Sequence, residues 1–200
     1  MLYSGCMIGL QAMLLLSALT APVAAQVGGW PVGRLHEAST SIARLPPADR
    51  LLVHALLRPE MGPLFQDQSP RTLDKAISSF RAERLNLGGA PALAVQPIGD
   101  ELCGATGNCS FWIIDIQHRR ILFRSDVIQT FAVDRISPHG LPDIITGTHS
   151  SATETDLIRW HYEGAQYIHQ SCATVDYADA DGNAYKQPKI DSHPCSIEGN

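Results

Sequence analysis

A histidine beside a serine occurs in the stretch Gly147-Thr148-His149-Ser150-Ser151, and this pairing is the first feature of the chain that could do chemistry. A hydrolase needs a base within reach of a nucleophile, and these two residue types supply both. Adjacent residues of a strand point to opposite faces, however, so the side chains of His149 and Ser150 would not meet if both residues lay on a strand. We interpret the stretch as a polar loop at a strand end.

Two further sets of side chains could bind a metal ion if the fold brought them together. One is a set of histidines, which would converge if the last strands pair, although their spacing does not require it: His139, His149 and His161. The other resembles half of a calcium loop, at Asp179, Asp181 and Asn183, but it lacks a closing glutamate. We interpret the first set as surface residues and the second as a turn, and we predict no cofactor and no metal site.

Four cysteines follow the N-terminal apolar segment, namely Cys103, Cys109, Cys172 and Cys195. In an exported chain an even number predicts disulfides, with three connectivities open. Pairing of neighbours is the simplest, because the residues between the first two are the turn-forming Gly-Ala-Thr-Gly-Asn. Loop closure would then contribute about 2.4 and about 3.4 kcal/mol. A zinc site or a reactive thiol is the alternative, but zinc sites space cysteines more closely and add histidines.

Residues 1–25 have the character of a signal peptide. Met7 to Leu19 is an uncharged apolar run that is short for a membrane span, and Pro22-Val23-Ala24-Ala25 supplies small residues at a cleavage position. No lysine or arginine precedes the run, so an uncleaved anchor or a buried helix is the alternative. We predict a periplasmic or secreted protein with no membrane span after cleavage.

The remaining residues, 26–200, are enough for a single domain with a core of its own. The net charge of −5 argues against nucleic acid as a partner, because such proteins carry a basic stripe. The chain has no Gly-x-Ser-x-Gly elbow, phosphate loop, His-Glu-x-x-His or dinucleotide fingerprint. These observations leave the question of catalysis open but favour a protein that is not an enzyme.

The first part of the domain, residues 34–82, is predicted to be helical. A stripe of apolar residues predicts one helix between residues 35 and 45. Pro47 opens a second helix, which we expect Pro59 to end. The third has the clearest start, with Ser69 as its cap and Pro70 at its first position.

Residues 84–170 are predicted to be antiparallel β structure. Apolar strands are expected near residues 92–95, 111–116, 121–123, 144–148, 156–162 and 166–169, and Glu163-Gly164 is a good hairpin turn. Ile158, Trp160 and Tyr162 share one face of their strand and should be buried, whereas Arg159 and His161 face the other way. Residues 171–200 are polar and are predicted to be a tail that a disulfide tethers.

Two segments of the β part are similar to each other. Phe80, Arg84, Leu85 and Pro91 match Phe131, Arg135, Ile136 and Pro142 at one constant offset, and after a length change Phe111 matches Leu157. Similarity at a spacing of about 45–50 residues is typical of β repeats. We expect an α+β fold, in which helices cover one face of a duplicated β part that forms one curved sheet or two packed sheets.

Residues 135–146, with Gly140-Leu141-Pro142-Asp143, resemble the loop and strand of FG-GAP/VCBS-type β-propeller repeats, as residues 84–95 do more weakly. The resemblance implies a strand–turn–strand unit whose acidic loop binds calcium. Arg135 takes the place of the first calcium ligand here, and Arg84 takes it in the first copy, so only the shape carries over. We hypothesise that Arg135 and Asp143 form an ion pair instead.

Three classes of function remain. The favoured one is a non-enzymatic binding or inhibitor-type protein outside the cytoplasm, which recognises a protein or an envelope polymer. The alternatives are a small hydrolase, in which His139, Asp143 and either His149 or His161 converge, and an envelope structural component. For the binding protein we expect contact through residues 104–108, with Thr106 and Asn108 touching the partner, because a closed loop loses little entropy on binding. Neither the partner nor the oligomeric state is predicted.

Overall fold

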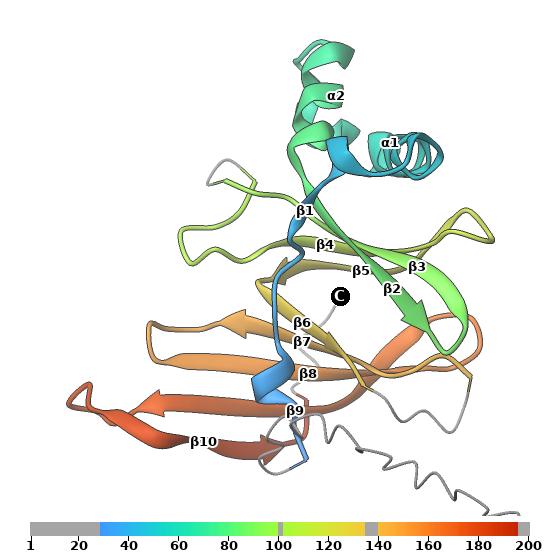
Figure 1. Cartoon of the computed structure of the whole chain (residues 1–200). Helices are drawn as coiled ribbons and strands as arrows, with labels where there is room; N and C mark the ends of the chain where they lie inside the picture. Colours follow the sequence, from blue (N-terminus) through green and yellow to red (C-terminus); the bar gives the residue numbers. More distant parts are fainter. Residues whose placement is uncertain (1–28, 100–101, 135–139, 196–200) are drawn as a thin grey trace, which may run out of the picture.

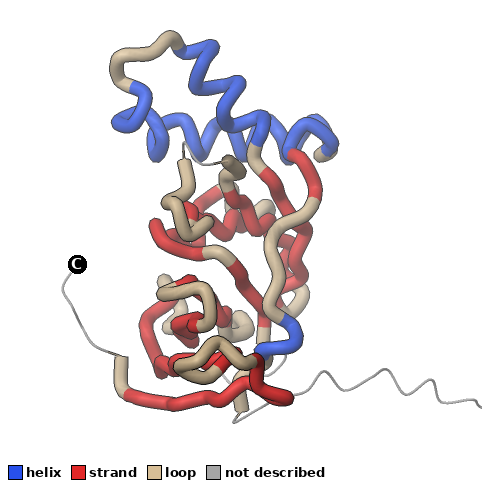
Figure 2. The backbone as a smooth tube through the Cα atoms, turned by 90° about the vertical axis from the view of Figure 1, so that its left-hand side faces the viewer, coloured by secondary structure: helices blue, strands red, loops and turns tan. Residues whose placement is uncertain are grey.

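The computed structural model describes residues 29–99, 102–134 and 140–195. The predicted signal peptide falls outside these residues. Two five-stranded antiparallel sheets lie one above the other, and two helices cover the outer face of the first sheet (Figure 1). Seen from the side, the helices and the two sheets form three successive layers (Figure 2). The predicted α+β class, with helices on one face of the β part, is confirmed, and of the two sheet arrangements left open the protein has two packed sheets.

Each sheet is a meander in which every strand pairs with its neighbour in the chain. The first has the order β1-β2-β3-β4-β5, with strands Thr40–Ser41, Arg81–Leu87, Ala90–Gln96, Cys109–Asp115 and Arg120–Ile128. The second has the order β10-β9-β8-β7-β6, and from β6 to β10 its strands are Thr130–Val133, Ile144–His149, Glu154–Tyr162, Tyr167–Ala178 and Ala184–His193. Gln129 alone separates β5 from β6, so the chain passes from one sheet to the other within one residue.

The central strands of the first sheet are buried on both faces, which explains their continuous apolar runs. In β4, Phe111 packs between the sheets, where its ring lies 4.9 Å from that of Phe131. Its neighbour Trp112 points to the other side and stacks on Phe80, beneath the helices. Successive side chains of β4 therefore point to opposite faces of the sheet and into two separate cores.

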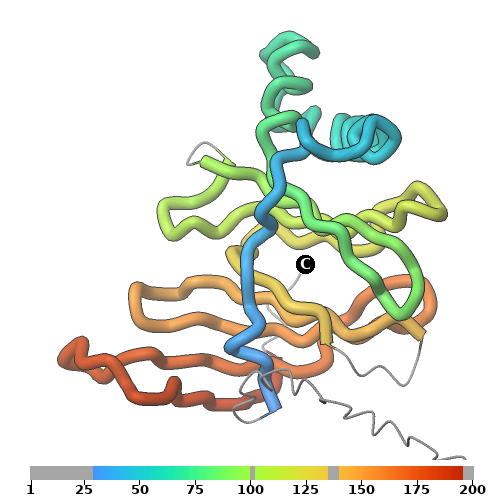
Figure 3. Tube along the Cα trace, viewed as in Figure 1, coloured from blue at the N-terminus to red at the C-terminus, as the bar shows by residue number. Residues whose placement is uncertain are grey.

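The second sheet also has two different faces. Tyr162 is buried in the core between the sheets, as predicted, and Trp160 packs against it there, whereas Ile158 is only partly buried and belongs to no core. Arg159 lies on the opposite face, as predicted. That outer face has a small core of its own, which the N-terminal segment covers with Trp30 and which includes Ile145, Leu157, Ala173 and Val175. The segment runs along both sheets before the helices begin (Figure 3).

The helical part differs in detail from the prediction. Helix α1 spans Pro47–Met61 and begins at Pro47 as expected, and α2 spans Pro70–Ser79 with Ser69 as its cap, accepting from Thr72 N–H at 3.3 Å. The expectation that Pro59 ends the first helix is wrong. Pro59 lies inside α1, and the carbonyl that loses its partner there belongs to Ala55 on the exposed side.

The helix predicted between residues 35 and 45 does not form. The 3-10 turns η1 (Val32–Arg34) and η2 (Ile42–Arg44) and the short strand β1 occupy this region. His36 exchanges two backbone hydrogen bonds with Phe131, at 3.0 and 2.8 Å, and β1 pairs with β2. The edges of both sheets thus satisfy the backbone groups that a helix would have satisfied internally. A further 3-10 turn, η3 (Gly62–Phe65), connects the two helices.

The C-terminal part is more ordered than a tethered tail. Residues 171–178 continue β9, and β10 pairs with it as the edge strand of the second sheet. Cys172 and Cys195 are joined, so the disulfide closes a hairpin and not a loose segment. The sequence does not reveal this strand because its side chains are mostly exposed and polar.

Candidate functional site

The first disulfide closes a small loop that projects between β3 and β4. Cys103 and Cys109 are joined, with their Cα atoms 4.2 Å apart, as the pairing of neighbours predicts. Inside the loop Gly104 N–H donates to the carbonyl of Asn108 at 2.9 Å, and Gly107 N–H donates to that of Gly104 at 2.8 Å. The loop is therefore held by both a covalent bond and its own backbone.

Asn108 fixes this loop to the second sheet. Its side-chain oxygen accepts from His149 N–H at 3.0 Å, and its amide nitrogen donates to the carbonyl of His149 at 2.9 Å. The same nitrogen also donates to Thr106 Oγ1 at 2.8 Å. Of the two residues predicted to touch a partner, Thr106 is exposed at the tip, whereas Asn108 supports the loop from below.

An apolar groove lies between this loop and the turn η3. It has a volume of about 470 Å³, and its apolar walls are Met61, Leu64, Phe65 and Leu102. Leu64 is 66% exposed, although it lies beside the buried Met61. Gln68, Gly104 and Ser110 supply polar groups at the same groove. Such a combination of apolar walls and a few polar groups is typical of a binding surface.

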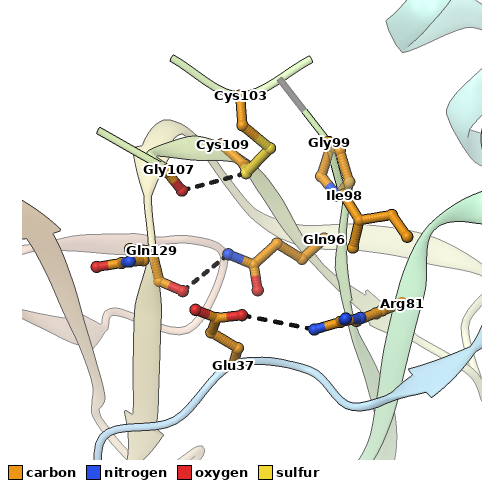
Figure 4. Close-up of a pocket in the computed structure, with 10 residues that line it drawn as sticks. Glu37, Arg81, Gln96, Ile98, Gly99, Cys103, Gly107, Cys109 and Gln129 are labelled. Carbon is orange, nitrogen blue, oxygen red and sulfur yellow. Dashed lines mark hydrogen bonds and ion pairs between the residues drawn. A yellow bond between two sulfur atoms is a disulfide. The ribbon is translucent and has the colours of Figure 1, made fainter. Parts of the chain in front are cut away.

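A smaller polar pocket lies on the other side of the loop, with a volume of about 230 Å³ (Figure 4). Gln96 donates from its amide to the carbonyls of Ile128 at 3.1 Å and Gln129 at 2.8 Å. Glu37 and Arg81 face each other across it at 3.6 Å. Because Gln96 holds the corner where β5 becomes β6, we interpret this pocket as part of the joint between the two sheets.

A buried network of charges occupies the outer face of the second sheet. Asp143 lies 2.8 Å from His161 Nδ1, and Arg159 forms ion pairs with Asp134 and, at 3.9 Å, with Asp143. All four side chains are less than one-fifth exposed. Arg159 also donates to the carbonyl of Gly29 at 2.9 Å, so this network holds the N-terminal segment on the sheet.

The hypotheses about Asp143 can now be compared with this network. Arg135 and His139 lie outside the described residues, so the proposed pair of Arg135 with Asp143 stays a prediction. Asp143 and His161 do meet, but His149 lies at the other end of β7, against Asn108. In the network as described, Asp143 is held by Arg159 and His161 of the fold itself, as in a structural polar network.

A further cluster, which the sequence analysis missed, joins the two helices. Ser78 Oγ lies 3.2 Å from His54 Nε2, and His54 Nδ1 lies 3.5 Å from a carboxylate oxygen of Asp74. This order of groups resembles a Ser-His-Asp triad. The sequence signal is a pair of polar residues four apart on each helix, His54 with Arg58 and Asp74 with Ser78.

The hydrogen bonds of this cluster do not prepare a nucleophile. Ser78 Oγ also donates to the carbonyl of Asp74 at 2.8 Å, so this carbonyl competes with His54 for the serine proton. Arg58 holds the carboxylate of Asp74 with two bonds of 2.7 and 2.9 Å, and these bonds lower the pKa of Asp74. A triad needs the histidine to accept the serine proton, and here the carbonyl of Asp74, in the same helix as Ser78, lies closer to the serine oxygen than His54 does.

The turn at residues 179–183 is confirmed as a turn. The carboxylate of Asp179 accepts from the backbone N–H groups of Asn183 at 2.9 Å and Asp181 at 3.0 Å, and the bond from Asn183 lowers the pKa of Asp179. Within the ranges that the structure describes, no three His, Cys, Asp or Glu side chains are placed to hold a metal ion.

Comparisons with protein-family models, with curated proteins and with solved structures found no match. Within residues 29–99, 102–134 and 140–195 there is no helix with the length and apolar character to cross a membrane. The function is therefore inferred from the geometry alone.

Proposed function

We propose that the protein is a non-enzymatic binding protein that acts outside the cytoplasm and captures a polypeptide partner. The contact face is the disulfide-closed loop together with the apolar groove beside it. The observation that carries this proposal is Leu64, a large apolar side chain that is two-thirds exposed at the rim of the groove. Apolar walls would receive a side chain of the partner, and the polar groups of Gln68 and Ser110 suit the hydrogen bonds of a peptide.

The rigidity of the loop supports the same proposal. A disulfide, two backbone hydrogen bonds and the side chain of Asn108 fix the loop before any partner arrives. Ordering a loop on association weakens binding, so a loop that is already ordered binds more tightly for the same contacts. Thr106, exposed at the tip, is in position to touch a partner that lies in the groove.

The edges of the sheets give less support to a structural component that polymerises. Such a protein would need an unpaired strand to which another copy adds. In β10 a register shift between Ala184 and Lys189 interrupts the edge, and Pro188 cannot donate a ladder hydrogen bond there. The outer strand β5 carries Arg124 and Asp126. Bulges, proline and charges of this kind oppose edge-to-edge pairing.

We infer in addition that the scaffold is a duplicated unit, with β2–β5 corresponding to β6–β9. The pairing of Leu93 with Ile114 corresponds to that of Ile144 with Trp160 at the offsets found in the sequence. A register shift follows Ile113 in the first copy and Arg159 in the second, which are equivalent positions. The resemblance to FG-GAP/VCBS-type repeats belongs to this proposal, as a likeness in shape of the two units.

Two exposed leucines on the helical layer allow a matched test of the proposed groove. Leu64→Ser removes an apolar wall of the groove from η3, whereas Leu51→Ser removes a similarly exposed side chain, 69% accessible, from α1, outside the groove. The oxidised chain, residues 26–200, is used as bait in periplasmic and envelope extract, and captured proteins are quantified by mass spectrometry. We expect a partner retained by the parent and by Leu51→Ser, with affinity for Leu64→Ser reduced about tenfold or more.

Equal capture by the two variants would remove the groove from the proposal. Retention of polysaccharide in place of protein would show that the partner is an envelope polymer. Hydrolysis of a captured partner over time, lost on His54→Ala, would favour the enzyme instead.

A further inference from the structure

A second hollow on the helical layer has a different chemistry from the groove. It has a volume of about 530 Å³ and lies between α1, α2 and the turn from β4 to β5. Arg50, His54 and Arg58 line it from α1, spaced four residues apart and so on one face of the helix. Arg119 closes it from the turn. The hollow therefore gathers three guanidinium groups in a chain whose net charge is −5.

The three arginines differ in what balances their charge. Arg58 is neutralised by Asp74, the one carboxylate that lines the hollow. Arg50 donates to the carbonyl of Ala43 at 3.3 Å, and among the described residues no carboxylate lies within ion-pair distance of it. The side chain of Arg119, which also lines the hollow, forms no hydrogen bond or ion pair with the described residues. Two positive charges thus border the hollow without a counter-charge from the fold.

Arg119 is placed there by an unfavourable backbone conformation. Its φ of 54° lies in the left-handed region, and it is the one non-glycine residue of the described chain with a positive φ. Glycine or asparagine adopts this conformation with less strain than arginine does. Asp115 holds the turn by accepting from His118 N–H at 3.0 Å and from its ring at 2.6 Å. The turn is therefore fixed, and Arg119 occupies a left-handed position that glycine or asparagine would favour.

The geometry points to an anion-binding site in this hollow, which takes a phosphate or sulfate group between Arg50 and Arg119. Guanidinium groups donate in pairs to such oxyanions, and donors from two elements suit a tetrahedral group that accepts from several sides. His54 adds an imidazole to the same wall. Leu51, exposed at the edge of the hollow, would contact an apolar part of a larger ester that carries the anion.

The test uses a substitution that separates binding from stability. Arg119→Gly removes the cation and replaces it with the residue that the left-handed conformation favours, so the thermal midpoint should stay the same or rise. Arg50→Gln removes the second cation, and Arg71→Gln, on an exposed position of α2 away from the hollow, is the control. Calorimetric titration at low ionic strength with inorganic phosphate, sulfate and phenyl phosphate measures the affinity of each protein.

We expect saturable binding by the parent and by Arg71→Gln, and a loss of about tenfold in affinity in each of the other two variants. Tighter binding of phenyl phosphate than of inorganic phosphate would identify an ester as the ligand, and equal affinities would identify the free ion; both results support the site. Absence of saturable binding to all three probes overturns the inference. Unchanged affinity in Arg50→Gln and Arg119→Gly overturns it as well.

Discussion

Single side chains of this protein hold its turns and loops in place through the backbone. Asp115 is the clearest case, because it is buried at the end of β4 and binds both the backbone and the ring of His118. Burial by itself raises the pKa of Asp115, but the hydrogen bonds from His118 outweigh it, and the net pKa is lowered. A carboxylate with a lowered pKa in the folded state stabilises the fold above its unfolded pKa, and this contribution is lost as the pH falls.

Asp115→Asn should therefore destabilise the protein in a pH-dependent way. At pH 7 we expect a loss of about 1–2 kcal/mol, since the amide replaces a charged acceptor of two hydrogen bonds. The difference from the parent should shrink as the pH falls below about 4, where the unfolded carboxyl becomes protonated. Urea unfolding at several pH values between 7 and below about 4 measures the free energy of unfolding of both proteins. The exposed Asp126→Asn is the control. A difference that does not change with pH would contradict the account.

At the scale of elements, the disulfide loop is joined to the second sheet by a side chain and not by a strand. The amide of Asn108 pairs with both backbone groups of His149, as a neighbouring strand would. The loop and β7 are thereby one rigid unit, although about 40 residues separate the two in the chain. The groove has one wall on this unit and the other on η3.

Asn108→Ala should loosen this unit, because His149 N–H and C=O lose their partners. We expect a loss of about 1–2 kcal/mol in the free energy of unfolding and weaker capture of the partner. Thr106→Ala, which removes a single exposed hydrogen bond, should change stability by less than about 0.5 kcal/mol and act only on capture. Chemical unfolding of the oxidised variants decides this. Equal stability of the two would show that Asn108 does not support the loop.

Elements with local signals could be predicted from the sequence, and those with tertiary signals could not. The start of α2 was predictable because Ser69 and Pro70 act on their own turn. Residues 35–45 have helical periodicity, but they face the edges of two sheets, and which edge lies nearby is not encoded locally. Likewise β10 has few apolar residues because it is an exposed edge, so only its pairing with β9 reveals it.

The candidate site likewise has parts with local sequence signals and parts that depend on tertiary contacts. The pairing of the cysteines and the place of the loop were predictable from spacing and turn residues. The groove was not, because Leu64 and Leu102 meet only after the chain has passed through α2, β2 and β3. His54 and Ser78 are likewise visible as polar positions on two helices, but the sequence does not say that these helices face each other.

At the scale of the whole molecule, the fold is a stack of three layers with three separate cores (Figure 2). The chain crosses between the sheets at Gln129, and the N-terminal segment also joins both sheets, through His36 on β6 and through β1 on β2. Two disulfides add covalent closure at the loop and at the last hairpin, which suits an oxidising compartment. The central claim is that this rigid stack presents the loop and the groove to a polypeptide.

Photo-crosslinking from single positions tests that claim most directly. A benzoylphenylalanine residue is placed at Thr106 at the loop tip, at Leu64 at the groove, or at Tyr177, which is exposed on β9 outside the loop and the groove. After irradiation in the native extract, we predict that one polypeptide is joined to the protein from positions 106 and 64 and not from position 177. Crosslinking to that polypeptide from position 177 alone, or from none of the three, would contradict the account.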